Sequence, residues 1–101
     1  MSISSQYDAQ SKLLTISVRG RLDFKVQKQF RQAYEKEDAK PAQVRVDLEG
    51  TEDMDSSGLG MLLLLRDHFS DANPKIVLAN PSQELSKVLE IANFNKLFVI
   101  E

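Results

Sequence analysis

The sequence predicts an α/β fold, a sandwich in which a mixed sheet of four to five strands has parallel strands at its centre and helices packed mainly on one face. Short β-branched segments alternate with longer segments of helical periodicity from residue 12 to the end of the chain. This order is typical of parallel strands joined by right-handed helical crossovers. A further short segment before residue 12 predicts an initial hairpin, which makes the sheet mixed.

The size of the chain indicates one domain. Its 101 residues suffice for a single hydrophobic core but not for two, and no repeat, linker or low-complexity tract interrupts them. We therefore expect a single domain over residues 1–101. Hydrophobic residues make up 42% and charged residues 28%, the balance of an ordinary soluble globular protein rather than of a disordered one.

In the first half of the chain, residues 12–19 alternate around β-branched side chains and end at Gly20, which predicts a strand. Residues 4–8 are its expected hairpin partner. Asp23 is the expected N-cap of a following helix. Residues 36–41 carry charge of both signs and a proline, and predict a surface connection. The helix is predicted from apolar residues at helical spacing, namely Phe24, Val26, Phe30, Ala33 and Tyr34.

The second half continues the alternation. Residues 43–48 predict a strand with Val44, Val46 and Leu48 on one face, and residues 49–55 an acidic loop. The helix expected over residues 56–69 is so apolar that the sheet and its neighbours should cover most of it. The remaining expected elements are a turn at residues 71–74, a buried strand at 75–79, a helix starting near Pro81 or Ser82 with Leu85, Val88, Leu89 and Ala92 facing the core, and a last strand at 97–100.

Composition excludes several classes of function. The formal net charge of −2 and the pI near 5.4 provide no basic footprint for nucleic acid. There is no cysteine, so disulfides, thiolate nucleophiles and cysteine-bound metals are excluded, and a reducing compartment suits the chain. No basic segment precedes an apolar run at the N-terminus, and no run approaches the ~20 apolar residues of a membrane span. We expect a cytoplasmic protein that contacts no membrane.

The stretch most indicative of function begins the apolar helix. Asp55, Ser56, Ser57 and Gly58 follow a strand that ends at the carboxyl edge of the sheet, where binding sites in open α/β sheets usually lie. Unpaired backbone N–H groups and the helix dipole favour an anion at a helix start by ~0.3–1 kcal/mol. A phosphate on Ser56 is therefore compatible with this helix.

Two glycines, Gly58 and Gly60, lie in the first turn and a half of the same helix. Glycine within a helix costs ~1 kcal/mol relative to alanine, so their presence needs a reason. Close packing of the helix end against the sheet is one reason. Access of another protein's loop or a nucleotide to the backbone beside the serine is the other, and the sequence leaves both open.

Four carboxylates, from Glu49, Glu52, Asp53 and Asp55, lie just before the serines. A solvated acidic loop is the simplest interpretation. A metal site has little support, because the sole histidine, His68, lies far along the helix and no calcium-loop spacing is present. A phosphoserine would add a further charge of about −1.5 to −2 to this loop, which would repel a partner docked on the unmodified face.

These motifs resemble those of a known family. The sequence Asp-Ser-Ser-Gly-Leu-Gly at residues 55–60, preceded by Met54 and by the strand at 44–48, is similar to the signature of STAS domains of the bacterial anti-sigma factor antagonist type. The sequence Gly-Arg-Leu-Asp at residues 20–23 resembles the turn that leads into the first helix of that family. The resemblance extends over nearly the whole chain in length and element order.

The resemblance implies a partner-switching regulator that has no catalytic activity and no cofactor. In the family, a serine kinase of the GHKL ATPase type, often itself the anti-sigma factor, phosphorylates the serine after the aspartate of the motif. A PP2C-type phosphatase removes the phosphate. Here that serine is Ser56, with Ser57 as the less favoured acceptor and Asp55 shaping the site. The unphosphorylated protein would bind its partner, the phosphorylated protein would release it, and the free domain would be a monomer.

The residues expected at the partner surface surround Ser56. Asp23 and Phe24 belong to the turn that lies beside the phosphorylation site in the family, although Asp23 also fits a purely structural role as a helix cap. Met54 is expected as an exposed, adaptable contact, whereas Met61, Phe94 and Phe98 are expected in the core. The full expected set is Asp23, Phe24, Met54, Asp55, Ser57, Gly58 and Leu59.

Three other classes of protein fit the sequence less well. A serine hydrolase would require a histidine near Ser56 or Ser57, but His68 lies about three turns away along the same helix. A receiver-like phosphoacceptor based on Asp47 would require paired acidic residues after the first strand and a longer chain. A nucleotide- or small-ligand-binding or scaffolding module of the same fold, without a phosphoswitch, remains as the alternative, although no glycine-rich lysine loop supports it.

Overall fold

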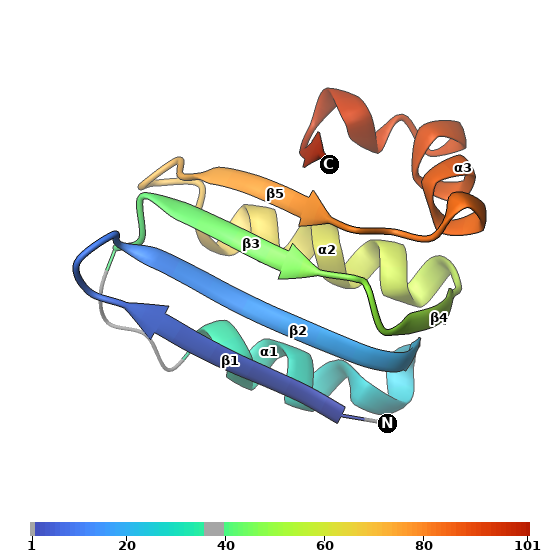
Figure 1. The fold of residues 1–101 in the computed structure, drawn as a ribbon, viewed down its shortest axis with the longest axis horizontal. Coiled ribbons are helices and arrows are strands. Elements are labelled where there is room, and N and C mark those ends of the chain that lie inside the picture. Colours follow the sequence, from blue (N-terminus) through green and yellow to red (C-terminus); the bar gives the residue numbers. More distant parts are fainter. Residues whose placement is uncertain (1, 36–39) are drawn as a thin grey trace.

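The computed structural model describes residues 2–35 and 40–101. Its sheet carries helices α1 and α2 on one face, and α3 lies beyond the end of β5 (Figure 1). The predicted α/β fold with helices mainly on one face is thus confirmed. The surface connection expected over residues 36–41 falls largely outside the described residues. In chain order, the elements are β1 Ser2–Asp8, β2 Leu13–Leu22, the 3₁₀ turn η1 Phe24–Val26, α1 Gln27–Glu35, β3 Gln43–Asp47, β4 Thr51–Met54, α2 Ser56–His68, β5 Lys75–Ala79, α3 Gln83–Ile91, the 3₁₀ turn η2 Phe94–Lys96 and β6 Val99–Ile100.

The sheet is mixed and has six strands within the described residues, in the order β1-β2-β3-β5-β6, with β4 paired to β2. β1 is antiparallel to β2, which confirms the hairpin, and the remaining pairs are parallel. The register sets Ile16, Val46 and Leu78 side by side on neighbouring strands. All three are fully buried, because their shared face is the one that α1 and α2 cover.

The structure corrects the loop expected over residues 49–55, because Thr51–Met54 form the strand β4. This strand pairs in parallel with the last part of β2, beyond the segment that pairs with β3. Thr51 and Met54 are buried, and the Thr51 hydroxyl donates a hydrogen bond of 2.9 Å to the Val18 carbonyl. Two of the four residues are acidic, and acidic residues are depleted in strands, so pairing with the long β2 overrides the local preference.

The helices follow the predicted pattern with shifted boundaries. The first helical segment begins as the turn η1, and regular α-helix starts only at Gln27. Ser82 is the N-cap of α3, since its hydroxyl oxygen accepts a hydrogen bond of 3.1 Å from the Leu85 N–H. The last strand contains only Val99 and Ile100, two residues fewer than expected. None of the helices in the described part of the chain is long and apolar enough to cross a membrane.

The core fills the space between the sheet and the helices. Met61, Phe94 and Phe98 are buried in it, as predicted. Tyr34 of α1 packs edge-on against His68 of α2, with ring centroids 4.9 Å apart, and against Phe30 at 5.9 Å. The contact between Tyr34 and His68 joins the C-terminal ends of α1 and α2.

Candidate functional site

The turn between β4 and α2 is organised by Asp55. Its backbone is extended (φ −100°, ψ −171°), and its carboxylate caps α2. One carboxylate oxygen, Oδ1, accepts a hydrogen bond of 3.0 Å from the Gly58 N–H and one of 2.5 Å from the Ser57 hydroxyl. The Ser57 hydroxyl is therefore part of the cap. Asp55 thus shapes the start of α2.

These hydrogen bonds lower the pKa of Asp55 below its ordinary value of 3.8; the bond from Ser57 is the main cause and the bond from the Gly58 N–H the next. A carboxyl group with a lowered folded-state pKa stabilises the fold at pH values above the ordinary pKa, and this contribution is lost as the pH falls through the folded-state pKa. We therefore predict that wild type unfolds at a higher temperature than Asp55→Asn near neutral pH. Thermal melts should show this difference in melting temperature decreasing below pH ~4. A difference that stays constant down to pH ~2.5 would contradict a contribution of the Asp55 charge to the stability of the fold.

Ser56 differs from its neighbour. It is the first residue of α2 and is exposed to solvent, whereas Ser57 is half-buried. Within the described part of the chain, the Ser56 hydroxyl makes no hydrogen bond, while the Ser57 hydroxyl is held by Asp55. A group transferred to Ser56 would leave the cap of α2 intact, and a group transferred to Ser57 would break it.

The sequence left two explanations open for the glycines of α2, and each explanation applies to a different glycine. A Cβ on Gly58 would lie 2.3 Å from the Leu22 carbonyl oxygen and 2.6 Å from Cγ of Met54, so Gly58 allows α2 to pack closely on the ends of β2 and β4. A Cβ on Gly60 would meet nothing within 4 Å. Close packing accounts for Gly58, and an open backbone surface is found only at Gly60.

Three residues expected at the partner surface are buried. Met54 was expected as an exposed contact, and this was wrong: it is 6% exposed, because it packs beneath Gly58. Gly58 is also buried. Asp23 is 8% exposed, and its carboxylate accepts a hydrogen bond of 3.0 Å from the Lys25 N–H, which confirms its role as a cap.

Other expected contacts are accessible. Phe24 is 67% exposed at the start of η1, and Leu59 is half-buried. The expectation that α2 is largely covered was wrong for its outer side, because Leu63 is 41% and Leu64 is 53% exposed. Side chains four and seven or eight residues apart share one side of a helix. The outward face of α2, defined here as Ser56, Gly60, Leu63 and Leu64, is therefore an accessible apolar surface with Ser56 at one end.

The acidic residues before Ser56 include one ion pair. Nη2 of Arg21 lies 3.5 Å from Oδ2 of Asp53, and both side chains are about 60% exposed. Within the described residues, no cluster of histidine and acidic side chains has the arrangement of a metal site. The segment before Ser56, which includes β4, is thus a negatively charged surface, and Arg21 is paired with it through Asp53.

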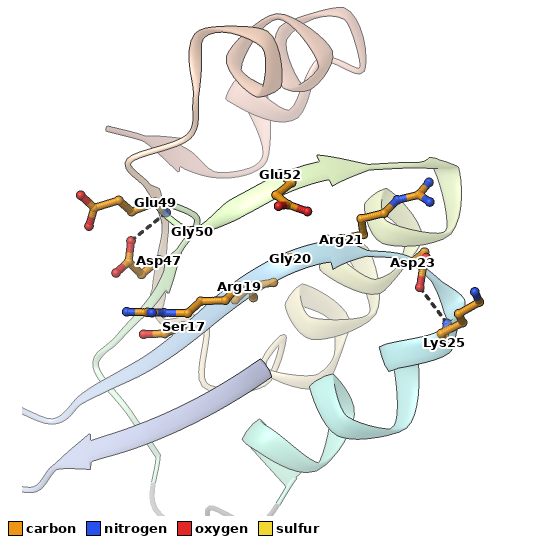
Figure 2. A pocket seen from close by; sticks show the side chains of 11 residues that line it. Ser17, Arg19, Gly20, Arg21, Asp23, Lys25, Asp47, Glu49, Gly50 and Glu52 are labelled. Atoms are coloured by element: carbon orange, nitrogen blue, oxygen red, sulfur yellow. Dashed lines mark hydrogen bonds between the residues drawn. The ribbon is translucent and has the colours of Figure 1, made fainter. Parts of the chain in front are cut away.

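An open cavity of about 640 Å³ lies where β2 changes its partner from β3 to β4 (Figure 2). It contains Gly20 and Gly50, whose backbones are joined by a hydrogen bond of 2.9 Å. Its volume is that of a small-molecule pocket, but such pockets are mostly apolar. Here the lining is highly charged, with three basic residues and four acidic ones, Arg19, Arg21, Lys25, Asp23, Asp47, Glu49 and Glu52.

Sequence reasoning missed Arg21 and the exposure of Leu63 and Leu64. The position of Arg21 beside Asp53 depends on the pairing of β2 with β4, a strand that the sequence pattern did not predict. The number of leucines in α2 indicated burial, but only some of them face the sheet. The signal that was available is the position of Leu63 and Leu64 seven and eight residues after Ser56, which places them on its side of the helix.

The geometry thus defines a small α/β domain with an exposed serine at a helix start, beside an acidic strand. A family model described as "Mlab, STAS domain" matches residues 5–101. The chain belongs to the STAS domain family, as the sequence motifs indicated. The STAS-domain containing protein PA14_20770 of Pseudomonas aeruginosa is 47% identical over 100 residues, which cover 99% of each chain.

Solved structures share the fold at lower identity. The anti-sigma factor antagonist SpoIIAA in its unphosphorylated form is 19% identical with a TM-score of 0.70, covering 99% of this chain and 87% of that one. The Bacillus SpoIIAA in its phosphorylated form is 18% identical with a TM-score of 0.67, covering 99% and 91%. A sulfate transporter family protein from Wolinella succinogenes is 13% identical with a TM-score of 0.79, covering 94% and 80%. The fold is therefore shared by regulators and transporter-associated proteins, and function has to be argued from the site.

Proposed function

We propose that this chain is a non-catalytic partner-switching regulator of the anti-sigma factor antagonist type, switched by phosphorylation of Ser56. The unphosphorylated protein binds a regulatory protein through the outward face of α2 and the exposed Phe24. Phosphorylation of Ser56 releases that protein. The fold that this chain shares with SpoIIAA, an anti-sigma factor antagonist with structures of an unphosphorylated and a phosphorylated form, supports the proposal.

The observation that carries the proposal is the division of roles between the two serines. Asp55 and Ser57 form the cap of α2, and Ser56 is exposed with a hydroxyl that takes no part in it. A phosphate on Ser56 would lie near unpaired N–H groups and the positive end of the helix dipole. The fold would then survive the modification, and the change would be local.

The same location explains how the modification would act on binding. Ser56 lies at one end of an apolar helix face, and a few residues of an interface usually carry most of its binding energy. A phosphate adds about −1.5 to −2 charges and three oxygen acceptors beside Asp53 and Asp55. An apolar partner surface docked there would have to desolvate this charge, so the complex would dissociate.

The partners follow from the same proposal. A serine kinase of the GHKL type, acting also as the anti-sigma factor, would bind the unmodified face and phosphorylate Ser56 with ATP. A PP2C-type phosphatase would restore the unmodified form, and the cycle would operate in the cytoplasm. No step requires a cofactor or a catalytic group on this chain.

Peptide mass spectrometry on protein recovered from its native cell under several growth conditions tests this proposal. We expect a fractional phosphate on Ser56, present also in Ser57→Ala and absent in Ser56→Ala. The Ser57→Ala variant is the matched control, because it keeps the neighbouring hydroxyl at Ser56 while removing the other. Phosphate confined to Ser57, or no phosphate under any condition, would contradict the proposed switch.

The cavity beside β4 favours a second candidate, a nucleotide- or small-ligand-binding module. Its volume of about 640 Å³ suits such a ligand, but its charged lining lacks the apolar walls that usually bury one. Thermal melts with and without nucleotides separate the candidates. A nucleotide that raises the melting temperature of wild type, but not of Arg19→Gln, would favour the ligand-binding role.

A further inference from the structure

Arg21 occupies a distinctive position at the end of β2. The register of β2 and β4 sets Arg21 opposite Asp53, and Leu22 opposite Met54. The guanidinium group and the Asp53 carboxylate are 3.5 Å apart, with 59% and 60% of the side chains exposed. A single long contact between two exposed side chains is weak, so Arg21 is available for a stronger anion.

The charge of Arg21 also acts on the start of α2. Figure 2 shows it directed along the end of the sheet toward the turn between β4 and α2. Its positive charge is one of the causes that lower the pKa of Asp55, the residue next to Ser56. Arg21 thus contacts Asp53 and acts electrostatically on Asp55, the residue before the serine that we propose to be phosphorylated.

We propose that Arg21 is the phosphate-binding residue of the modified protein, and that its guanidinium moves from the Asp53 carboxylate to the phosphate on Ser56. This proposal rests on the phosphorylation of Ser56 proposed above. It assigns a regulatory role to a residue of this chain outside the serine motif. The exchange is a rearrangement of one exposed side chain and needs no movement of the backbone.

Charge makes the exchange favourable. A phosphate dianion presents more charge than a carboxylate, and a guanidinium group can donate two parallel hydrogen bonds to it. The phosphate would otherwise lie among the carboxylates of Glu52, Asp53 and Asp55, which repel it. Of the charged groups in the preceding turn, Asp23 is held by the Lys25 N–H as a cap, and Lys25 offers a single ammonium charge.

The expected consequence is a stable modified state. Arg21 would neutralise part of the added charge and hold the phosphate against the start of α2. The Asp53 carboxylate would lose its partner, so the modified surface would gain an unpaired negative charge as well as the phosphate. Both changes disfavour the partner that docks on the unmodified face.

Phosphorus NMR of the protein with phosphoserine incorporated genetically at residue 56 tests the proposal. The second pKa of a phosphoserine is ordinarily about 6, and an adjacent guanidinium lowers it. We expect Arg21→Gln to raise this pKa by roughly one pH unit. Asp53→Asn, which removes the competing carboxylate, should lower it below the value in the phosphorylated protein with Arg21 and Asp53 intact.

The matched control is Arg19→Gln, which removes the same charge from the same strand. Figure 2 shows Arg19 directed toward Ser17, away from Arg21. The control should therefore change the phosphate pKa much less than Arg21→Gln does. Equal changes for the two arginine variants, or a higher pKa in Asp53→Asn, would overturn the proposal.

This experiment is independent of the kinase. The phosphate is installed during synthesis, so a missing cellular phosphorylation would refute the switch without altering the titration. Conversely, a phosphate pKa that does not change in Arg21→Gln would refute this inference without contradicting the proposed switch. The two failures are therefore distinguishable.

Discussion

Gly58→Ala is expected to destabilise the domain by roughly 1–3 kcal/mol, because the added methyl group would lie 2.3 Å from the Leu22 carbonyl oxygen. The obstructing atom belongs to the backbone of β2, so relief requires the helix to move away from the sheet. Improved helix propensity would offset up to ~1 kcal/mol of strain. Urea denaturation followed by circular dichroism measures the change in the free energy of unfolding.

Gly60→Ala is the matched control, since it makes the same substitution two residues along the same helix. A Cβ at Gly60 meets nothing within 4 Å, so the substitution changes stability only through the higher helix propensity of alanine. We expect this variant to be as stable as wild type or more stable by up to ~1 kcal/mol. If the two variants lost stability equally, the close packing of Gly58 on β2 would not be the reason for its presence.

Ser56→Asp is expected to weaken partner binding by tenfold or more, because it places a charge within the proposed interface, on the same side of α2 as the exposed leucines. Ser56→Ala should bind as wild type does and should not respond to the kinase. The test uses both variants as baits in the native lysate and compares the quantity of each captured protein. Both variants should fold, since Ser56 takes no part in the cap.

A control for the added charge is Ser4→Asp on the edge strand β1, where Ser4 is exposed. This variant should capture the same proteins as wild type. Equal capture by Ser56→Asp and Ser4→Asp would show that the partner does not dock at Ser56. Loss of capture by both would indicate a nonspecific effect of charge.

Much of the fold could be predicted where local pattern and tertiary packing agree. Residues 75–79 form a strand with the expected bounds, and α2 starts at Ser56 as expected. Val44 and Val46 lie on the buried face that their alternation indicated. In each case the apolar residues lie on the side of the element that the core requires.

Predictions from the sequence were wrong where a tertiary contact outweighs the local preference of the residues. β4 is a strand because β2 extends past β3 and offers unpaired backbone groups, although acidic residues disfavour strands. Met54 is buried for the same reason. The exposure of Leu63 and Leu64 depends on which side of α2 meets the sheet, and helical spacing alone does not determine that side.

The capping role of Asp23 could be predicted from the sequence, whereas the functional role of the residues around Ser56 stays a prediction. Asp23 is a cap, as its residue type and position predicted, whereas a role for Asp55 at the helix start was expected only from the resemblance to the family. The resemblance favoured Ser56 over Ser57, but the hydrogen bond from Ser57 to Asp55 could not be predicted, since both serines have the same neighbouring carboxylate in the sequence. The different roles of Gly58 and Gly60 also depend on atoms from β2 and β4 that are distant in sequence.

The most direct test of the switch compares two forms of one protein. A protein captured by the Ser56→Ala bait is purified and titrated, in equilibrium binding measurements, with the unmodified chain and with the chain carrying phosphoserine at residue 56. We expect the phosphorylated form to bind at least about tenfold more weakly, with an unchanged circular dichroism spectrum. Equal affinity of the two forms would refute the proposed switch.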